Sequence, residues 1–168
     1  MPSIRTSTSV ATTTPPATTT SPKPPTVTPA KPSVNANDVT HQATFITKNA
    51  VADGGSPTLT FDYVQFLTGS AADKAAKAHN DTVENDYYVV NDNKKLRTFP
   101  VSSAVVIVLH PGNGPQFHRN FTWAEFKSLM QTHTATYGGD MYDWSAETIY
   151  YINIKNGKVT RVEQQWVP

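Results

Sequence analysis

The sequence predicts an α+β domain in which a curled, mainly antiparallel sheet of about six to seven strands packs with two helices. Many short segments alternate apolar and polar residues or form apolar runs between turn residues, which is typical of strands. Two segments combine a helix start signal with apolar or alanine residues at helical spacing. Most strands follow one another without an intervening helix, and this order favours antiparallel pairing.

The composition of the chain changes near residue 40. Of the first 34 residues, 26 are Thr, Pro, Ser or Ala, and all aromatic residues come later, from Phe45 onward. A Thr/Pro-rich segment buries too little apolar surface to offset the entropy lost on ordering. We therefore expect a disordered tether over residues 1–40 and a single globular α+β domain over residues 41–168.

The first half of the domain is expected to hold four strands and one helix. The strands are predicted where apolar and aromatic residues recur between turn residues, over residues 42–51, 59–67, 87–90 and 96–101. The helix is predicted over residues 71–79, because Ser70 and Asp73 have the spacing of a capping box before an alanine-rich segment. A turn is expected at Asp53-Gly54-Gly55-Ser56.

The second half begins with the clearest strand signal, the continuous apolar run of residues 104–109. Residues 110–115 then form a loop, because two prolines and two glycines interrupt regular structure. Thr122 and Glu125 form the capping box of a second helix, with Phe121 and Phe126 at the hydrophobic staple positions.

After His133 the chain is expected to loosen before a terminal hairpin over residues 148–154 and 159–167. The two strands are joined by Asn156-Gly157, the preferred pair for a two-residue type I′ turn. The turn predicts the cross-strand pairs Ile154 with Val159 and Tyr151 with Val162, which would lie on opposite faces.

Charge and composition exclude several functional classes. The first 34 residues carry Arg5, Lys23 and Lys31 without any acid, so a net charge of +1 for the whole chain leaves the rest near −2. Nucleic-acid recognition would need a basic face, and we expect no nucleic-acid partner. The lack of cysteine removes disulfides and thiolate metal sites, and no apolar run approaches the roughly 18 residues of a membrane span.

The sequence contains no basic and apolar segment of the kind that forms a signal peptide. Thr/Pro-rich spacers commonly hold exported domains away from a membrane or wall. We therefore expect that the export signal lies upstream of Met1 and that the domain is secreted or tethered to the cell envelope.

Four stretches have a familiar order: DYVQFLTG at 62–69, NDYYVVN at 85–91, LRTFPV at 96–101 and GKVTRVEQQWVP at 157–168. Together they resemble an uncharacterised exported domain of bacteria, typical of actinobacterial lipoproteins, that follows a Thr/Pro-rich spacer. The resemblance spans about residues 43–168 and implies export with lipid or wall tethering. Since the chain lacks a lipid-bearing cysteine, membrane contact is expected only through an N-terminal anchor that the sequence does not contain.

The segment of residues 85–97 is the predicted recognition surface. Adjacent tyrosines on a strand point to opposite faces, so one of them can pack inward while the other offers a ring and hydroxyl to a ligand. Nearby amide, carboxylate and guanidinium groups suit a sugar or peptide. The predicted ligand-binding residues are Asn85, Asp86, Tyr87, Tyr88, Asn91, Asn93 and Arg97. In the alternative interpretation these residues have only structural roles. Asn85 and Asp86 then cap a strand, residues 91–93 form a turn, and Arg97 pairs with Asp86.

A second candidate site is a catalytic loop near the Gly-rich segment of residues 137–140. There Asp140, Asp143 and Glu147 surround Trp144, and a carboxylate beside a tryptophan can act as a general acid. The same residue types also occur in surface loops over the edge of a core. These three carboxylates are therefore the alternative catalytic set.

Two sets of residues could in principle bind a metal ion, but neither has the spacing of a known metal-binding motif. The histidines His110, His118 and His133 lack the tight ligand spacing of zinc or copper sites. The acidic residues Asp81, Glu84, Asp86 and Asp92 lack the order of a calcium-binding loop, although an ion-dependent adhesion domain is a third possibility. We expect no metal and no cofactor.

These observations favour an extracytoplasmic binding or interaction module of the cell envelope. Its ligand is expected to be an envelope component, namely a glycan, a peptide or a protein. The alternative is a small secreted hydrolase acting on glycan or peptide through a pair of loop carboxylates. We expect the chain to be a monomer.

Overall fold

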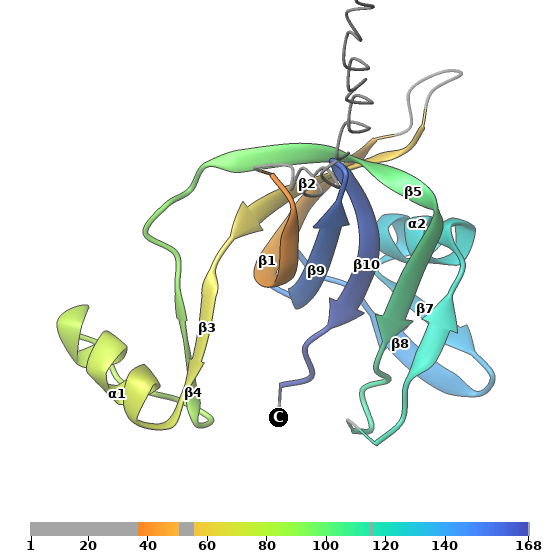
Figure 1. Cartoon of the computed structure of the whole chain (residues 1–168). Helices are drawn as coiled ribbons and strands as arrows, with labels where there is room; N and C mark the ends of the chain where they lie inside the picture. Colours follow the sequence, from red (N-terminus) through yellow and green to blue (C-terminus); the bar gives the residue numbers. More distant parts are fainter. Residues whose placement is uncertain (1–36, 51–55, 115, 168) are drawn as a thin grey trace, which may run out of the picture. The chain divides into compact units, whose positions relative to one another are not determined.

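The computed structural model describes residues 37–50, 56–114 and 116–167, with the side chains of residues 48–50 left out (Figure 1). The tether predicted over residues 1–40 lies almost wholly outside the described residues, as does most of the turn predicted at residues 53–56. The first strand begins at Val39, within the last residues of the predicted tether.

The described residues form two helices and a strand-rich, curled sheet, so the predicted α+β class is confirmed. The elements are β1 (Val39–Ala50), β2 (Thr58–Tyr63), β3 (Gln65–Thr68), α1 (Gly69–Ala78), β4 (Tyr87–Val90), β5 (Leu96–Leu109), β6 (Arg119–Phe121), α2 (Trp123–Thr132), β7 (Thr134–Tyr137), β8 (Asp140–Asp143), β9 (Ile149–Lys155) and β10 (Lys158–Gln164).

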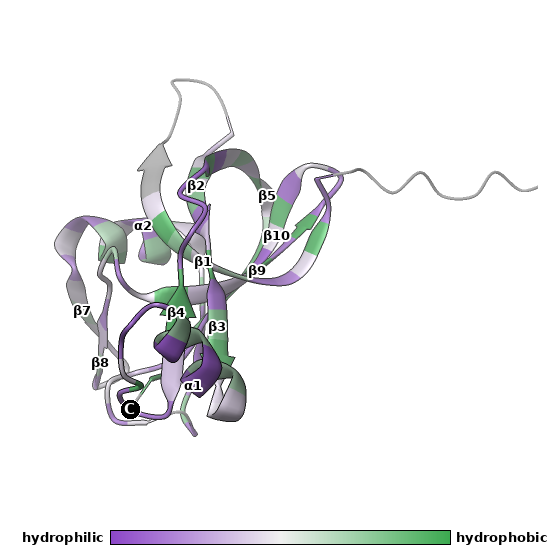
Figure 2. Ribbon diagram, turned by 90° about the vertical axis from the view of Figure 1, so that its left-hand side faces the viewer, coloured by the Kyte–Doolittle hydropathy of each residue, from purple (hydrophilic) through white to green (hydrophobic). Residues whose placement is uncertain are grey.

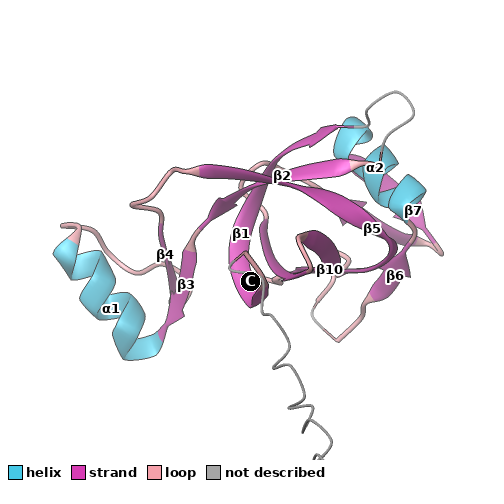
Figure 3. Cartoon of the chain, turned by 45° about the horizontal axis from the view of Figure 1, so that its top comes forward, coloured by secondary structure: helices cyan, strands magenta, loops and turns pink. Residues whose placement is uncertain are grey.

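Five strands close into a barrel (Figure 3). Strand β1 lies between β2 and β9, β2 pairs with β5, and β9 pairs with β10, all antiparallel. A parallel pairing of β10 with β5 completes the ring. With α2 between the third and fourth barrel strands, this connectivity is that of the five-stranded Greek-key barrel called the OB-fold. Because such folds host many unrelated activities, the connectivity alone specifies no function.

Strand β5 makes the closure possible. The sequence predicts separate strands over residues 96–101 and 104–109, but the structure has one strand of 14 residues. Its first part pairs with β2 through residues 96–100, and its second part pairs with β10 at Val101 and, after a register shift, at residues 106–108. The two serines between the apolar runs stay extended, so the strand passes from one neighbour to the other without a turn.

The barrel and α2 share the main hydrophobic core. Phe126, Leu129 and Met130 of α2 are buried together with apolar side chains from the barrel strands, among them Ile46, Leu59, Phe61, Ile107, Leu109, Ile152, Ile154, Val159 and Val162. The capping box predicted for α2 is confirmed, since Thr122 and Glu125 bond reciprocally at its first turn. Helical spacing of apolar residues thus places one face of α2 on the barrel.

The register of the terminal hairpin differs from the prediction. Ile154 pairs with Val159 as expected, but Val162 pairs with Ile152 rather than with Tyr151. A β-bulge between Val159 and Arg161 inserts one extra residue and shifts the register. As a result Val159 and Val162 are both buried in the same core, instead of lying on opposite faces.

Residues 65–90 form an arm that leaves the barrel between β2 and β5 and contains β3, α1 and β4 (Figure 1). The predicted second strand breaks at Val64, and β3 pairs with β4 in a separate two-stranded sheet. Figure 2 shows apolar residues on both strands. Helix α1 begins at Gly69 behind Thr68, which makes no side-chain cap, so the capping box predicted at Ser70 and Asp73 is wrong.

The segment after His133 is regular rather than loose. Strands β7 and β8 form a hairpin in which Tyr137 pairs with Asp140. Gly138 and Gly139 make its turn, at φ angles of 63° and 93° that other residues rarely adopt. The predicted catalytic residues Asp140 and Asp143 therefore lie on a strand.

Candidate functional site

Two adjoining cavities open beside the last described residues of the chain. The first has a volume of about 370 Å³ and is lined by Tyr87, His110, Pro111, Gly112, Asp143, Ser145, Glu147, Thr148, Ile149, Gln164, Gln165, Trp166 and Val167. The second, of about 320 Å³, is lined by His41, His110, Tyr151, Glu163, Gln164, Gln165 and Trp166. We call the two cavities together the C-terminal groove, because they share His110, Gln164, Gln165 and Trp166.

Hydrogen bonds hold the chain end against the barrel. The backbone N–H of Gln165 donates to the carbonyl oxygen of Ile149 at 2.8 Å, which continues the β9–β10 pairing past the end of β10. The backbone N–H of His110 donates to Oε1 of Gln164 at 3.0 Å. These bonds bring together the end of β10, the start of β9 and the loop after β5. Trp166 follows Gln165 directly, is half-buried and lines both cavities.

His110 has one ring nitrogen engaged by the protein. Its Nδ1 lies 2.9 Å from the carbonyl oxygen of Phe117. A carbonyl oxygen only accepts hydrogen bonds, so Nδ1 is the donor in this contact, and in the neutral form of the ring the lone pair lies on Nε2. Since His110 lines both cavities, the groove contains a hydrogen-bond acceptor with a defined tautomer.

His41 enters the second cavity from a distorted part of β1. The register of β1 against β9 shifts between Val39 and Gln42, and His41 has a left-handed φ of 54°. Its backbone N–H donates to Oδ1 of Asn153 at 2.7 Å, and its ring stacks on Tyr151 with centroids 3.8 Å apart. Bulges often redirect a side chain beside a functional site, and strained backbone is concentrated at such sites.

The predicted catalytic set is divided by the structure. Asp143 and Glu147 line the first cavity, and within the described part of the chain neither forms an ion pair. Asp140 instead accepts a hydrogen bond from Asn113 at 3.3 Å. Trp144 packs against the main core and the ring of His133, so the groove's tryptophan is Trp166, which the sequence analysis did not select.

The predicted recognition surface is also divided. Asn85 and Asp86 have φ angles of 54° and 61° between the bridged residues Glu84 and Tyr87, so they form a tight hairpin turn. Tyr87 packs on Phe66 and lines the first cavity of the groove. Tyr88 is half-buried and lines, together with Asn85 and Tyr87, a separate cavity of about 330 Å³ in the arm.

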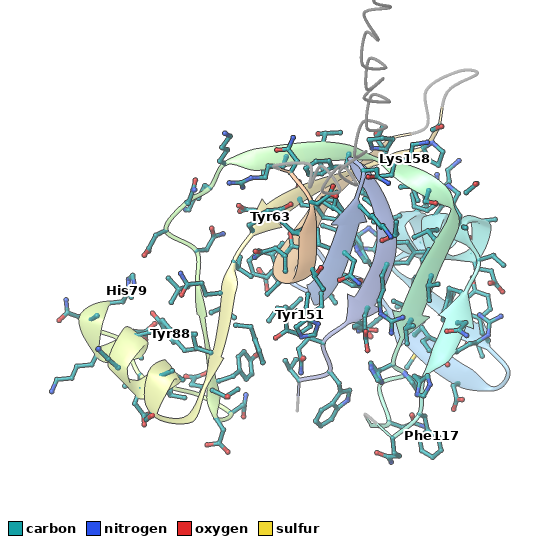
Figure 4. All side chains as sticks on the ribbon, viewed as in Figure 1. Tyr63, His79, Tyr88, Phe117, Tyr151 and Lys158 are labelled. Atoms are coloured by element: carbon teal, nitrogen blue, oxygen red, sulfur yellow. The ribbon has the colours of Figure 1, made fainter. Side chains whose placement is uncertain are left out.

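The hydroxyl group of Tyr88 donates to Asp81 at 3.2 Å, and its ring lies 6.0 Å from that of His79 (Figure 4). Desolvation raises the pKa of Tyr88, and the hydrogen bond to Asp81 and the negative charges of Asp81 and Asp92 raise it further. The Nε2 atom of His79 lies 3.8 Å from the Oδ1 atom of Asp92. Tyr88 thus takes part in contacts within the arm.

The remaining predicted residues make structural contacts. Asn91 donates to the buried carboxylate of Asp62 at 2.9 Å. Asn93 accepts a hydrogen bond from the backbone of Lys95 at 3.2 Å. Arg97 bonds to the carbonyl oxygen of Lys95 at 2.7 Å and lies over the ring of Tyr63 at 4.4 Å, so the alternative in which it pairs with Asp86 is not the observed arrangement.

The histidines and acids considered for metal binding do not converge. His110 and His118 are neighbours with ring centroids 6.2 Å apart, whereas His133 contacts Trp144. Among the residues that the structure describes, no group of three or more His, Cys, Asp or Glu side chains is arranged to hold a metal ion. The described helices also include none long and apolar enough to cross a membrane.

Comparisons with protein-family models, with curated proteins and with solved structures found no match. The C-terminal groove joins Tyr87 of the predicted recognition surface, Asp143 and Glu147 of the alternative catalytic set, and His110, which was considered as a metal ligand but not predicted to be one. Residues 164–166 were not among the predicted site residues, and their signal in the sequence was an aromatic residue preceded by two glutamines at the end of a strand.

Proposed function

We propose that this domain is an extracytoplasmic binding module of the cell envelope and that the C-terminal groove is its binding site. The observation that carries the proposal is the shared lining of two cavities by aromatic, imidazole and amide side chains. Ligand sites typically combine apolar and aromatic walls with a few converging polar groups. The groove has this composition on a rigid barrel.

The cellular location is proposed from the sequence. A Thr/Pro-rich segment of the kind that forms spacers precedes the domain, and the motif order resembles that of exported bacterial domains. A module held away from the membrane or wall by a spacer meets glycans, peptides and proteins of the envelope. The proposed ligand is one of these components, and the proposed binding requires no cofactor.

A two-dimensional amide NMR titration of the full chain tests the proposal. Soluble peptidoglycan fragments, neutral oligosaccharides and short peptides are added in turn. The proposal expects at least one of them to shift the signals of Gln164, Gln165, the Trp166 indole and the His110 backbone. Shifts confined to other surfaces, or no shift with any of these probes, would contradict it.

The alternative proposal is a small hydrolase of glycan or peptide. It is favoured by the position of Asp143 and Glu147, which line the same cavity as His110 and supply carboxylates for acid–base chemistry. Mass spectrometry of the same probes after incubation with the wild type, Asp143→Asn and Glu147→Gln tests it. Cleavage by the wild type that is lost in both variants supports hydrolysis, whereas intact probes with the wild type exclude it for these substrates.

A further inference from the structure

We infer that the C-terminal groove binds a neutral glycan chain and that His110 and Gln164 together recognise one of its hydroxyl groups. The inference rests on the proposed function, because it names the ligand class of the same groove. It follows from the hydrogen bonds that His110 and Gln164 already make within the protein and from the charges of the residues that line the groove.

The first step is the pairing of donor and acceptor at the junction of the cavities. The Oε1 atom of Gln164 already accepts from the backbone N–H of His110, so the amide group has its Nε2 donor left for a ligand. The Nδ1 atom of His110 is engaged with Phe117, so the imidazole has its Nε2 acceptor left. Both side chains line both cavities, and a hydroxyl group, which donates and accepts at one oxygen, matches such a pair.

The second step is the charge of the lining. The carboxylates of Asp143 and Glu147 line the first cavity, and neither forms an ion pair within the described part of the chain. Glu163 lines the second cavity, and its carboxylate is paired with Arg161 at 2.8 Å. The described lining residues include no Lys or Arg. A phosphate or carboxylate ligand would meet these acids without a cation to pair with, which costs free energy. Carboxylates accept hydrogen bonds well, so they suit a neutral ligand that brings many O–H donors.

The third step is the aromatic surface. Trp166 borders both cavities, Tyr87 borders the first, and the stacked rings of His41 and Tyr151 border the second. Flat rings with a polar edge suit ligands that have an apolar face and a polar rim, as sugar rings do. Since both cavities share one wall, a chain of repeating sugar units fits them better than a single small molecule.

A cationic peptide is the rival ligand, because an ammonium group suits carboxylates and aromatic rings. An ammonium group only donates, so a peptide would have to place a carbonyl oxygen beside it to meet the Nε2 donor of Gln164, whereas a hydroxyl group donates and accepts at one oxygen. The observations therefore favour the glycan, and a lysine peptide serves as the discriminating probe.

The experiment measures binding of a neutral N-acetylglucosamine tetramer and of a tetralysine peptide to the full chain by NMR titration. Two variants remove one partner each. His110→Asn keeps an amide donor near Nδ1 for the Phe117 carbonyl but lacks the Nε2 acceptor, and Gln164→Glu replaces the Nε2 donor with an oxygen. Loss of one partner of a buried hydrogen bond predicts tetramer binding weaker by about 5- to 100-fold in each variant.

His118→Asn is the matched control, since His118 is exposed and outside the described lining of both cavities. It should bind the tetramer like the wild type, and dispersed amide spectra of all variants verify folding. The ¹⁵N shifts of the His110 ring should report an Nδ1–H tautomer and should change when the tetramer binds.

Binding of tetralysine in the groove without binding of the tetramer would overturn the glycan inference and leave the proposed function standing. Equal tetramer affinity of the wild type and both variants would overturn the roles of His110 and Gln164. If neither these probes nor the peptidoglycan fragments shift the groove, the proposed function and the inference both fail.

Discussion

The side-chain oxygen of Gln164 accepts a 3.0 Å hydrogen bond from the backbone N–H of His110. This bond links the end of β10 to the loop that follows β5, and the two strands are the parallel partners that close the barrel. The relationship therefore connects the closure of the fold to the position of the groove's histidine.

Replacing Gln164 with Ala is expected to expose the amide of His110 to solvent exchange. The predicted loss of global stability is small, about 0.5–1.5 kcal/mol, because one hydrogen bond is removed. Hydrogen exchange followed by NMR measures the protection of this amide. Gln165→Ala is the control, since the bond of Gln165 to Ile149 uses its backbone N–H. Equal exchange at His110 in wild type and Gln164→Ala would show that the bond does not hold the loop.

A second prediction concerns acid stability at the start of α2. Glu125 completes the capping box and lies 2.6 Å from Arg119, whose guanidinium group also lies over the rings of Phe121 and Tyr137. The hydrogen bond from Arg119, followed by that from the backbone of Thr122, lowers the pKa of Glu125 from 4.5 to about 2. The folded chain thus holds this carboxylate charged at pH values where the unfolded chain protonates it.

The stabilisation by Glu125 is therefore fully present above pH 4.5 and is lost as the pH falls towards 2. Urea unfolding of wild type and Glu125→Gln should show a stability difference at pH 6 that shrinks between about pH 4.5 and pH 2. Glu84→Gln, at an exposed position, should show no such trend. A difference for Glu125→Gln that stays constant over this range would contradict the assignment.

A third prediction concerns the buried carboxylate of Asp62, which is 8% exposed. Asn91 donates to its Oδ2 atom at 2.9 Å, and its Oδ1 atom has no hydrogen-bond partner among the described residues. Asn91→Ala should cost about 1–3 kcal/mol of unfolding free energy, because it leaves a buried carboxyl group without its hydrogen-bond donor. Asn93→Ala, on the exposed side of the same segment, is the control. Equal stability of the two variants in urea would refute this role.

A fourth prediction concerns the terminal turn. Gly157 has a φ of 69° next to Asn156 at 52°, as a type I′ turn requires. Gly157→Ala places a side chain in the left-handed region and should cost about 1–2 kcal/mol. Gly112→Ala, where no atom lies within 4 Å of an added Cβ, should change the free energy of unfolding much less. Equal melting temperatures for the two variants would contradict the turn assignment.

Local patterns predicted much of the fold. Alternation located β2, the apolar run located the second part of β5, and reciprocal capping located α2. The predictions of the hairpin register and of two separate strands in place of β5 were wrong, because contacts between residues distant in the sequence determine these features. The bulge near Thr160 coincides with a register shift in the parallel pairing of β10 with β5, and Ser102 and Ser103 lie in β5 between its part that pairs with β2 and its part that pairs with β10. Neither feature follows from the local sequence.

The groove was predicted in pieces for the same reason. Tyr87, His110 and the pair Asp143 and Glu147 were considered for three different roles, and only the folded chain brings them to one cavity. Asn85 and Asp86 carry the residue types of a binding site and also those of a tight turn, so composition alone did not separate the two roles. Trp166 could not be recognised as a groove residue from the sequence, because its position depends on the hydrogen bonds of Gln164 and Gln165 to distant parts of the barrel.

The most direct test of the groove compares the full chain with Trp166→Ala and Phe117→Ala in cosedimentation with isolated cell-wall glycan. Trp166 lines both cavities. Phe117 is an exposed aromatic residue outside their described lining (Figure 4). The contact of Phe117 with His110 uses its backbone carbonyl oxygen, so Phe117→Ala retains this contact. The wild type and Phe117→Ala should cosediment with the glycan equally. Trp166→Ala should bind the glycan at least about tenfold more weakly, as expected when a central aromatic contact is removed. Equal sedimentation of all three proteins, or no binding by the wild type, would contradict the account.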